Sequence, residues 1–482
     1  MFMGFVCFMI NYERLAFYSS FLSTYSQSSV PGFIFIIQLF MHYNLILKNG
    51  TIVTPEKSFQ GDVAVNSGKI AKTGTPDPSD TADEVYDAAG KHILPGIIDA
   101  HVHFRDPGLT KKEDFRTGST AAVMGGVTTV ADMPNVVPAT STTELFNKKI
   151  AIAQEKSYAD FALFALLNND NLKEADKLKE TGALGFKVFY GTSTGDIASP
   201  STKILLKHLE SCLLRTGFHC ESNEINSFYL SECKSAIFGK EDTGHMLSEA
   251  RPVFSEALAI QTIICYAKYT GAKIHIHHVT SRDGLLLVAD AKQKGLDITA
   301  ETCPHYLLFD ADRCEHKVYP PIRSDIHRRS LWEAVCNGTI DMIASDHAPH
   351  TTEEKSLPVW EEPAGLSGVE TSVPLMLNEV NKGSMTINDY ARIASEAPAK
   401  TWGIFPQKGN LLPGADADFT IVDMNMRKTI HAQELHSKSK TSPYDGMEVK
   451  GFPVATIIRG KIVMQNGVLT GTKGYGTLIS PK

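Results

Sequence analysis

Two histidines separated by a single residue, His101 and His103, stand at the end of an apolar run that starts at His92. Residues two apart on a β-strand point to the same side, so both imidazoles can reach one metal ion. A strand that delivers two histidines and then ends suits a metal site at the rim of a barrel. A polar rim or a stacked histidine pair gives the same local pattern, so the rest of the chain has to decide.

Side chains of related chemistry stand at other apolar runs. We expect strands near residues 93–99, 127–133, 161–167, 184–189, 216–220, 273–279, 297–301 and 340–345. The run at 184–189 carries Lys187, and later runs end near His219, His278 and Asp346. The carboxyl ends of all strands in a parallel barrel meet at one rim, so these side chains are expected to converge. Alone, Asp346 would also fit a cap of the turn that follows it.

These residue types point to zinc. Imidazole and carboxylate groups bind zinc, and a catalytic zinc ion keeps one position open for water. Two zinc ions a few ångströms apart can share a hydroxide, because metal binding lowers the pKa of water. Such a pair needs a bridging anion, which Lys187 supplies only if carbon dioxide converts its amine into a carbamate. The unmodified lysine cation would be repelled by the metals.

Some of these side chains also have an ordinary structural explanation. Lys187 in an apolar strand fits a buried lysine paired with an acid. His219 and His278 each fit a core histidine with satisfied ring nitrogens. His275 and His277 compete with His278 as the metal ligand. We favour His278, because it stands at the strand terminus and on the opposite face from His277.

The order of apolar runs predicts the fold. Residues 96–405 alternate strand-like runs with segments of helix length, which is typical of a parallel α/β fold. Eight such strands predict a (β/α)8 TIM-type barrel, although a doubly wound open sheet fits the pattern as well. Residues 41–95 and 406–482 carry short β-type runs separated by turn signals. We expect them to form one small β-sandwich domain built from both termini, the alternative being two independent β modules.

Composition narrows the class of protein. The chain has 482 residues, of which 43% are hydrophobic and 21% charged, as in an ordinary globular enzyme. The net charge of -7 argues against a nucleic-acid binder and favours a small-molecule partner. The eight cysteines include no Cys-x-x-Cys pair, which indicates reduced thiols and a cytoplasmic location.

Residues 1–40 differ from the rest of the chain. They are rich in Phe, Met, Tyr and Ser, and Glu13 and Arg14 are their only charged residues. They lack the basic segment that begins a secretory signal, and their apolar stretches are shorter than the roughly 20 residues of a membrane span. We expect a non-native extension from an upstream start codon, with the working protein beginning near Met41. A membrane anchor is the alternative.

Four motifs together resemble the dihydroorotase family of the amidohydrolase superfamily. They are Asp99-Ala-His-Val-His-Phe-Arg-Asp-Pro-Gly108, Ala131-Asp-Met-Pro-Asn135, Gly185-Phe-Lys187 and Ser345-Asp-His-Ala-Pro-His350. The resemblance covers the chain from about Met41 onward, and it implies the same barrel and β-sandwich. It also implies a two-metal site, in which one zinc ion is held by His101, His103 and Asp346, and the other by His219 and His278. Carboxylated Lys187 and a hydroxide would bridge the two ions, and Asp346 would act as the catalytic proton shuttle.

The same resemblance implies how a substrate is held. Arg105 and Asn135 suit a substrate carboxylate, through charge-assisted hydrogen bonds, and dihydroorotate carries one. Hydantoin- and dihydropyrimidine-cleaving relatives usually lack this arginine, and allantoinases tend to have Asn there. Arg105 as a surface salt-bridge partner is the structural alternative. The remaining implied substrate contacts are His350, Pro363, Ala364 and Gly365.

The chain departs from the family pattern at two positions. Tyr319 stands where the family commonly has an Asn that helps to hold the substrate, so details of the pocket are open. Ser222 stands where an acid is common. Neither change removes a predicted metal ligand.

We therefore predict a zinc-dependent dihydroorotase, which cyclises N-carbamoyl-L-aspartate reversibly to L-dihydroorotate and water in pyrimidine biosynthesis. One alternative is a cyclic amidase of the allantoinase or dihydropyrimidinase type. Another is an inactive barrel that serves as a scaffold, which the six filled ligand positions disfavour. We expect a homo-oligomer without nucleic-acid or membrane partners, and association with aspartate carbamoyltransferase is left open.

Overall fold

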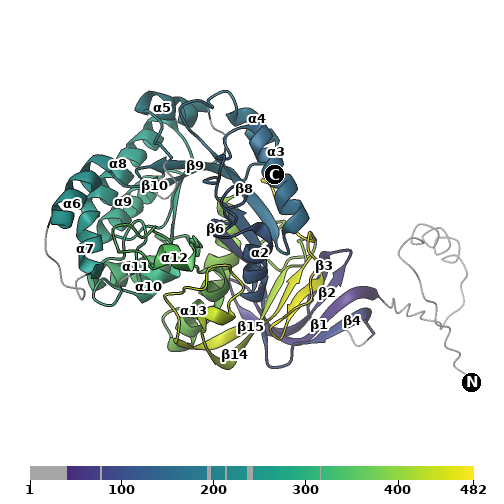
Figure 1. Ribbon diagram of the computed structural model, residues 1–482. Coiled ribbons are helices and arrows are strands. Elements are labelled where there is room, and N and C mark those ends of the chain that lie inside the picture. The colour runs from purple at the N-terminus through teal and green to yellow at the C-terminus, as the bar shows by residue number, and fades with distance from the viewer. Residues whose placement is uncertain (1–40, 76–78, 193–196, 212–213, 236–242, 315) are drawn as a thin grey trace, which may run out of the picture.

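The computed structural model describes residues 41–75, 79–192, 197–211, 214–235, 243–314 and 316–482. The predicted extension 1–40 lies outside these residues. Two sheets dominate the described part of the chain, one of eight strands and one of nine (Figure 1). They correspond to the predicted barrel and to the predicted β-sandwich.

The eight-stranded sheet is parallel, and its strands lie side by side in chain order. An isolated bridge from Val102 to His347 brings the last strand back to the first, so the barrel is nearly closed. Its strands are β6 (Ile97–Val102), β7 (Val127–Asp132), β8 (Asp160–Leu166), β9 (Gly185–Tyr190), β10 (Thr216–Cys220), β11 (Ile274–Ile276), β12 (Ile298–Thr302) and β13 (Met342–Ile343). All residues of β7, β8 and β10 are buried, as expected for strands covered on both faces. The prediction of a (β/α)8 barrel is confirmed.

The predicted strand 93–99 is in fact two strands that belong to different sheets. Strand β5 (His92–Pro95) pairs with β1 and β14 of the second sheet, and β6 begins the barrel at Ile97. Gly96 lies between them, where an added Cβ atom would stand 2.4 Å from the Thr128 hydroxyl oxygen. The glycine therefore permits the close approach at which the chain passes from one sheet to the other. An apolar run alone does not reveal this break.

Helices surround the barrel (Figure 1). Several begin at a residue whose side chain accepts a hydrogen bond from the first turn, namely Asp114, Thr142 and Ser281. The helical elements are α2 (Phe115–Met124), α3 (Thr143–Lys156), α4 (Ala175–Glu180), α5 (Thr202–Ser211), α6 (Asn223–Ser235), α7 (Thr243–Ala250), α8 (Val253–Thr270), α9 (Arg282–Gln293), α10 (Pro304–Leu308), α11 (Asp325–Asn337), α12 (Thr352–Lys355), α13 (Val369–Lys382), α14 (Ile387–Ala391), the π-helical turn η3 (Arg392–Glu396), α15 (Ala397–Thr401) and the 3-10 turn η4 (Ala432–Glu434). Among the described residues, no helix is long and apolar enough to cross a membrane.

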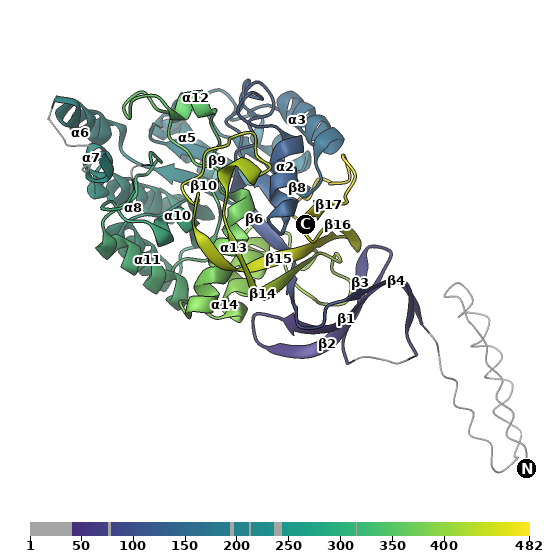
Figure 2. The ribbon, with the colours of Figure 1, turned by 60° about the horizontal axis from the view of Figure 1, so that its bottom comes forward.

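The nine-stranded sheet is built from both ends of the described chain (Figure 2). Its order is β17-β16-β15-β14-β5-β1-β2-β3, and β4 pairs with β1. Its other strands are β1 (His42–Val53), β2 (Ser58–Asn66), β3 (Lys69–Gly74), β4 (Thr81–Asp87), β14 (Phe419–Thr429), β15 (Glu448–Ile458), β16 (Lys461–Gln465) and β17 (Val468–Leu469). Leu45 and Ile52 share one core cluster with Phe419 and Ile457, so the two halves pack on each other. The predicted sandwich from both termini is confirmed, while the exact domain limits stay a prediction.

A buried charge cluster joins this sandwich to the amino-terminal end of the barrel. The Lys408 ammonium lies 2.6 Å from carboxylate oxygens of Asp160 and Asp418 and 3.0 Å from Asp416. Arg459 also pairs with Asp160. Burial alone would lower the pKa of Lys408, but the carboxylates of Asp418 and Asp160 outweigh it and raise this pKa. The lysine therefore neutralises acids from β8 and from the segment that leads into β14.

Replacing this lysine should weaken the junction between the two sheets. We expect Lys408→Met to lower the free energy of unfolding by ~3–5 kcal/mol, because buried carboxylates lose their counter-charge. Chemical denaturation followed by circular dichroism measures the change. The control is Lys400→Met, whose half-exposed side chain pairs with Glu396 and should contribute less than about 1 kcal/mol. Equal losses in the two variants would contradict this assignment.

Candidate active site

One buried cavity lies at the carboxyl ends of the barrel strands. It is lined by His101, His103, Arg105, Asn135, Lys187, Phe189, His278, Val318, Tyr319, Asp346, Ala348, Ala364 and Gly365. Most residues proposed from the sequence are thus brought together. The exceptions are His219, His350 and Pro363, which do not line the cavity, although His219 contacts His278 directly.

The first group of converging atoms comes from the ends of β6 and β13. The His103 Nε2 atom lies 3.1 Å from Asp346 Oδ1, and His101 Nε2 lies 3.3 Å from the same oxygen. His278 joins this group, because one ligand atom each from His101, His278 and Asp346 lie within 4.8 Å of one another. Two imidazole nitrogens and a carboxylate oxygen at this separation can hold one metal ion.

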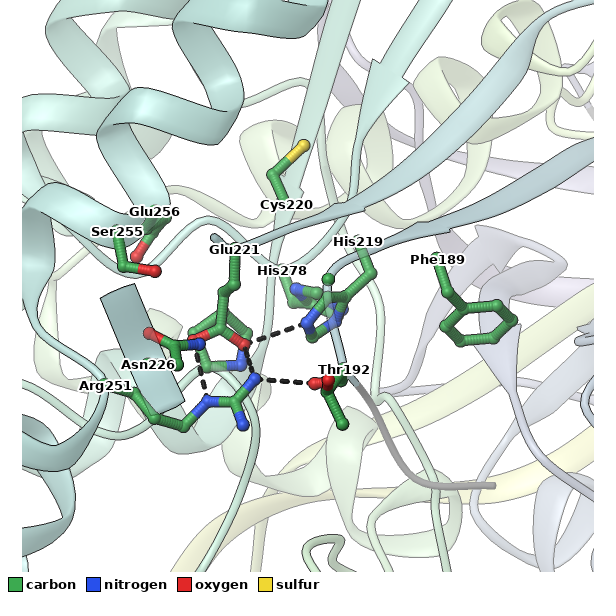
Figure 3. Close-up of polar contacts among 12 residues, drawn as sticks. Phe189, Thr192, His219, Cys220, Glu221, Asn226, Arg251, Ser255, Glu256 and His278 are labelled. Atoms are coloured by element: carbon green, nitrogen blue, oxygen red, sulfur yellow. Dashed lines mark hydrogen bonds and ion pairs between the residues drawn. The ribbon is translucent and has the colours of Figure 1, made fainter. Parts of the chain in front are cut away.

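The second group comes from β10 and β11. His219 Nδ1 lies 3.1 Å from His278 Nε2, so the two rings turn a nitrogen toward each other (Figure 3). The opposite nitrogen of His219 donates a hydrogen bond to the Glu221 carboxylate at 2.8 Å. That proton fixes the tautomer of His219 and leaves the lone pair of Nδ1 directed at His278.

Two further partners hold the first group of ligands in the same way. His101 donates from Nδ1 to Glu301 at 2.5 Å, and His103 donates from Nδ1 to the Asn135 side-chain oxygen at 2.6 Å. Both rings therefore present an unprotonated Nε2 toward Asp346. A metal ion needs this lone pair, and the outer hydrogen bond also orients the ring.

The electrostatics of the cavity favour ligands that are ready to bind a metal. Burial, together with neighbouring positive charge, lowers the pKa values of His101 and His278 well below the usual value, which keeps both imidazoles neutral. Asp346 supplies a carboxylate beside these rings, with Oδ1 3.1 Å from His103 Nε2. Neutral imidazoles beside an ionised carboxylate fit a divalent cation.

Lys187 projects from β9 into the cavity and is buried. Burial lowers its pKa to about 8. Among the described residues, no carboxylate lies within ion-pair distance of its ammonium nitrogen. The alternative of a buried lysine paired with an acid is therefore not found in the described part of the chain.

Three residues of the site have left-handed backbone conformations, which are unusual for residues other than glycine. The φ angles are 60° at Arg105, 35° at His278 and 46° at Asp346. Each residue follows the end of a barrel strand. Such strained conformations cost about 1–3 kcal/mol each and concentrate at functional sites, where the surrounding structure enforces them.

Two buried acids of the site, Glu221 and Glu301, were not predicted from the sequence. Glu301 accepts hydrogen bonds from His275 Nε2 at 3.0 Å and His277 Nδ1 at 2.9 Å, in addition to the one from His101. Both histidines are thus turned toward Glu301, while His278 reaches the cavity. The signal available in the sequence was an acid inside the apolar run Ile298–Thr302, comparable to Lys187 in its own run.

The loop after β13 places the remaining predicted contacts. His350 donates from Nε2 to the Ala364 carbonyl at 3.0 Å, and the Lys112 ammonium donates to its Nδ1 at 3.0 Å. His350 therefore supports the wall formed by Ala364 and Gly365 from behind. Pro363 lies outside the cavity, and its carbonyl accepts a hydrogen bond from Lys355.

Comparison with known proteins relates this geometry to a family. The sequence profile of the Amidohydrolase family matches residues 92–192 and 219–463. An L-hydantoinase from Paenarthrobacter aurescens is 34% identical over 457 residues, covering 91% of this chain and 98% of that protein. An allantoinase from Deinococcus radiodurans is 35% identical over 457 residues, covering 92% and 100%. The solved structure of L-hydantoinase (dihydropyrimidinase) from Arthrobacter aurescens matches with a TM-score of 0.87 and 35% identity, covering 91% and 100%.

These relatives correct the predicted reaction. The prediction of a dihydroorotase in pyrimidine biosynthesis is wrong, because full-length relatives are named L-hydantoinase and allantoinase. The error came from Arg105, since an arginine indicates an anionic group on a substrate without specifying the ring that carries it. The superfamily prediction holds at its broader level: the chain belongs to the amidohydrolase family.

Proposed function

We propose that the protein is a metal-dependent cyclic amidase that opens the ring of a 5-substituted hydantoin. The observation that carries this proposal is the convergence of His101, His103, His278, Lys187 and Asp346 on one buried cavity. Two full-length relatives, named L-hydantoinase and allantoinase, support the choice of ring. Allantoin is itself a hydantoin with a ureido substituent at C5, so both names refer to the same five-membered ring.

The residues present fit two zinc ions. His101, His103 and Asp346 would hold one ion, and His219 and His278 the other. When bound, the ions would polarise the ring carbonyl and make a water molecule nucleophilic near neutral pH. The chain contributes neutral imidazoles whose tautomers are fixed by Glu301, Asn135 and Glu221.

Lys187 would bridge the two ions after carboxylation. Its neutral amine would form an N–C bond with carbon dioxide and release a proton, which gives a carbamate. Burial, which lowers the pKa of Lys187 to about 8, makes the neutral amine accessible near physiological pH. The product is an anion, as the position between two cations requires.

Asp346 would move the proton during ring opening. Its carboxylate lies in the cavity with one oxygen near His101 and His103. It would accept a proton from the attacking water and deliver it to the ring nitrogen as the C–N bond breaks. The product would be an N-carbamoyl amino acid.

We further propose that Arg105 binds an anionic C5 substituent. Its side chain is buried, its Nε atom has no partner, and none of the ion pairs in the described part of the chain includes it. Arg105 Nη2 lies 3.4 Å from His350 Nε2, but that nitrogen already donates to the Ala364 carbonyl. Burial, together with the charges of Arg105 and Lys112, lowers the pKa of His350 to about 2, so this ring stays neutral. A buried guanidinium without an anion is costly, and an acidic substituent of the substrate would offset that cost.

Substrate specificity tests the proposed reaction. We expect the zinc-loaded enzyme to open hydantoin-5-acetic acid with a higher kcat/KM than unsubstituted hydantoin, allantoin, dihydrouracil or dihydroorotate. Ring opening is followed by loss of ultraviolet absorbance and by chromatography of the N-carbamoyl product. Zinc content is measured on the same sample. A two-zinc protein that opens none of the three hydantoins, or that prefers a six-membered ring, would refute the proposal.

Substitution of Arg105 tests its role separately from the chemistry. Arg105→Gln should lower kcat/KM for hydantoin-5-acetic acid by about 10–100-fold, the effect of losing one charge-assisted hydrogen bond. The value for unsubstituted hydantoin should change by less than about threefold, because that ring carries no anionic group for the guanidinium to bind.

Arg427→Gln is the control for loss of a positive charge, because its exposed side chain lies on β14 in the sandwich. It should leave both substrates unaffected. Equal losses on the charged and the neutral substrate in Arg105→Gln would show that Arg105 acts on the site as a whole.

A further inference from the structure

Arg251, which lies between α7 and α8, is held in a fixed position beside the cavity. Its side chain is 10% exposed and faces the Glu221 carboxylate with two nitrogens (Figure 3). Nε donates to Glu221 Oε1 at 2.8 Å, and Nη2 donates to the other carboxylate oxygen. Nη2 also donates to the Thr192 carbonyl at 2.7 Å. The guanidinium thus ties the segment after β10 to the loop after β9.

Through Glu221, this arginine acts on a predicted metal ligand. The Glu221 oxygen that faces Arg251 Nη2 is the one that accepts from His219 Nε2. Glu221 is buried, and its two oxygens face the Arg251 guanidinium on one side and His219 on the other. A carboxylate oxygen can only accept, so the proton of His219 lies on Nε2. This arrangement aims His219 Nδ1 at His278.

The same guanidinium covers a wall of the substrate cavity. Its central carbon lies 3.6 Å from the centroid of the Tyr319 ring, and Tyr319 lines the cavity while Arg251 does not. A cation stacked on a tyrosine face is attractive and restricts the tilt of the ring. Arg251 therefore holds the aromatic wall of the cavity in place from outside.

Only arginine can make all these contacts at once. A planar guanidinium pairs with both oxygens of a carboxylate in its own plane and stacks on a ring through its face. A lysine ammonium at the same place is a point charge, which can neutralise Glu221 but cannot also stack on Tyr319 and fix the carboxylate plane.

We propose that Arg251 is a positioning residue that couples the Tyr319 wall of the substrate cavity to the metal ligand His219. It touches neither the substrate nor a metal ion. It acts through Glu221 on one side and through the Tyr319 ring on the other. The substrate part of this inference rests on the proposed function, whereas the metal part does not.

Zinc titration of the metal-free protein tests the metal part. Isothermal titration calorimetry with zinc alone should give two binding events for the wild type. Arg251→Lys should weaken one of them by about 10–100-fold and leave the other unchanged, as expected when an outer partner of one ligand is lost. In a His219→Ala background, which removes the ligand that Arg251 reaches through Glu221, Arg251→Lys should have no further effect on the remaining zinc ion.

Variants of Tyr319 test the substrate part of the inference. Tyr319→Ala should raise KM for the best hydantoin by about tenfold. It should also weaken the zinc ion that Arg251→Lys weakens, by a smaller factor, because Arg251 loses its stacking partner but keeps Glu221. Tyr319→Phe keeps the ring and the stacking, so it should behave like the wild type. Arg251→Lys should raise KM as well as weaken one zinc ion, and in Tyr319→Ala its additional effect on KM should be small.

Arg459→Lys is the matched control. Arg459 also pairs with a buried carboxylate, that of Asp160, and its guanidinium carbon lies 4.5 Å from the centroid of the Tyr475 ring. It is located at the opposite end of the barrel, so its replacement should lower thermal stability without altering zinc affinity or KM. This variant separates loss of a buried arginine pair from loss of the specific link to His219.

The outcomes are distinct. A selective loss at one zinc site in Arg251→Lys, with both sites intact in Arg459→Lys, supports the proposal. Unchanged zinc affinities in Arg251→Lys, or equal weakening of both sites, would overturn it. If the wild type opens no hydantoin, the proposed function fails, but the zinc titrations still decide the role of Arg251.

Discussion

The tautomer of each buried imidazole is the constraint on which the site depends. A histidine can bind a metal ion only through a nitrogen that carries no proton, and for a buried ring the hydrogen-bond partner on the other nitrogen decides which one that is. Here a side-chain oxygen stands behind each of three rings. Glu301 holds the proton of His101, Asn135 that of His103, and Glu221 that of His219. These partners come from β12, from the loop after β7 and from the residue after β10. The barrel is therefore needed to place the outer partners as much as the ligands themselves.

The two ends of the barrel use buried charge for different purposes. At the amino-terminal end, Lys408 is surrounded by Asp160, Asp416 and Asp418, so the charges compensate one another and join the barrel to the sandwich. At the carboxyl end, Arg105 has no acid partner among the described residues and lines the cavity. A buried charge without a counter-charge destabilises the protein, and it is tolerated where a ligand of opposite charge can bind beside it. This contrast follows the usual division of a barrel into a stabilising face and a functional face.

The sequence predicts much of the fold and of the ligand set, because both follow from local patterns. Continuous apolar runs mark the barrel strands, and a histidine, lysine or aspartate at the end of such a run marks the rim. Local patterns do not reveal the side chains that hydrogen-bond to the ligand histidines from behind. Glu301 and His101, for example, are 200 residues apart, and only the closed barrel brings them together. The break at Gly96 is hidden, since an apolar run has no feature that assigns its two halves to different sheets. Strand β4 is missed because Thr81–Asp87 is mostly exposed and acidic, and it is held by its pairing with β1.

In the proposed function, different parts of the site recognise the ring and its substituent, which explains why the substrate is harder to predict than the residues at the strand ends. The histidines, Lys187 and Asp346 would act on an amide bond, and an amide bond is common to every cyclic ureide. They come from strand ends, whose positions are fixed by the barrel. Arg105 and Tyr319 belong to loops, which vary without disturbing the barrel. Both line the cavity, where they would contact a substituent of the ring. Relatives with the same fold can therefore carry the names of different substrates.

In this chain the link from Tyr319 through Arg251 and Glu221 to His219 means that a change in one loop also affects the geometry of a predicted metal ligand. Specificity and metal binding are then not independent, and a loop that adapts to a new substituent must keep the arginine that holds it in place.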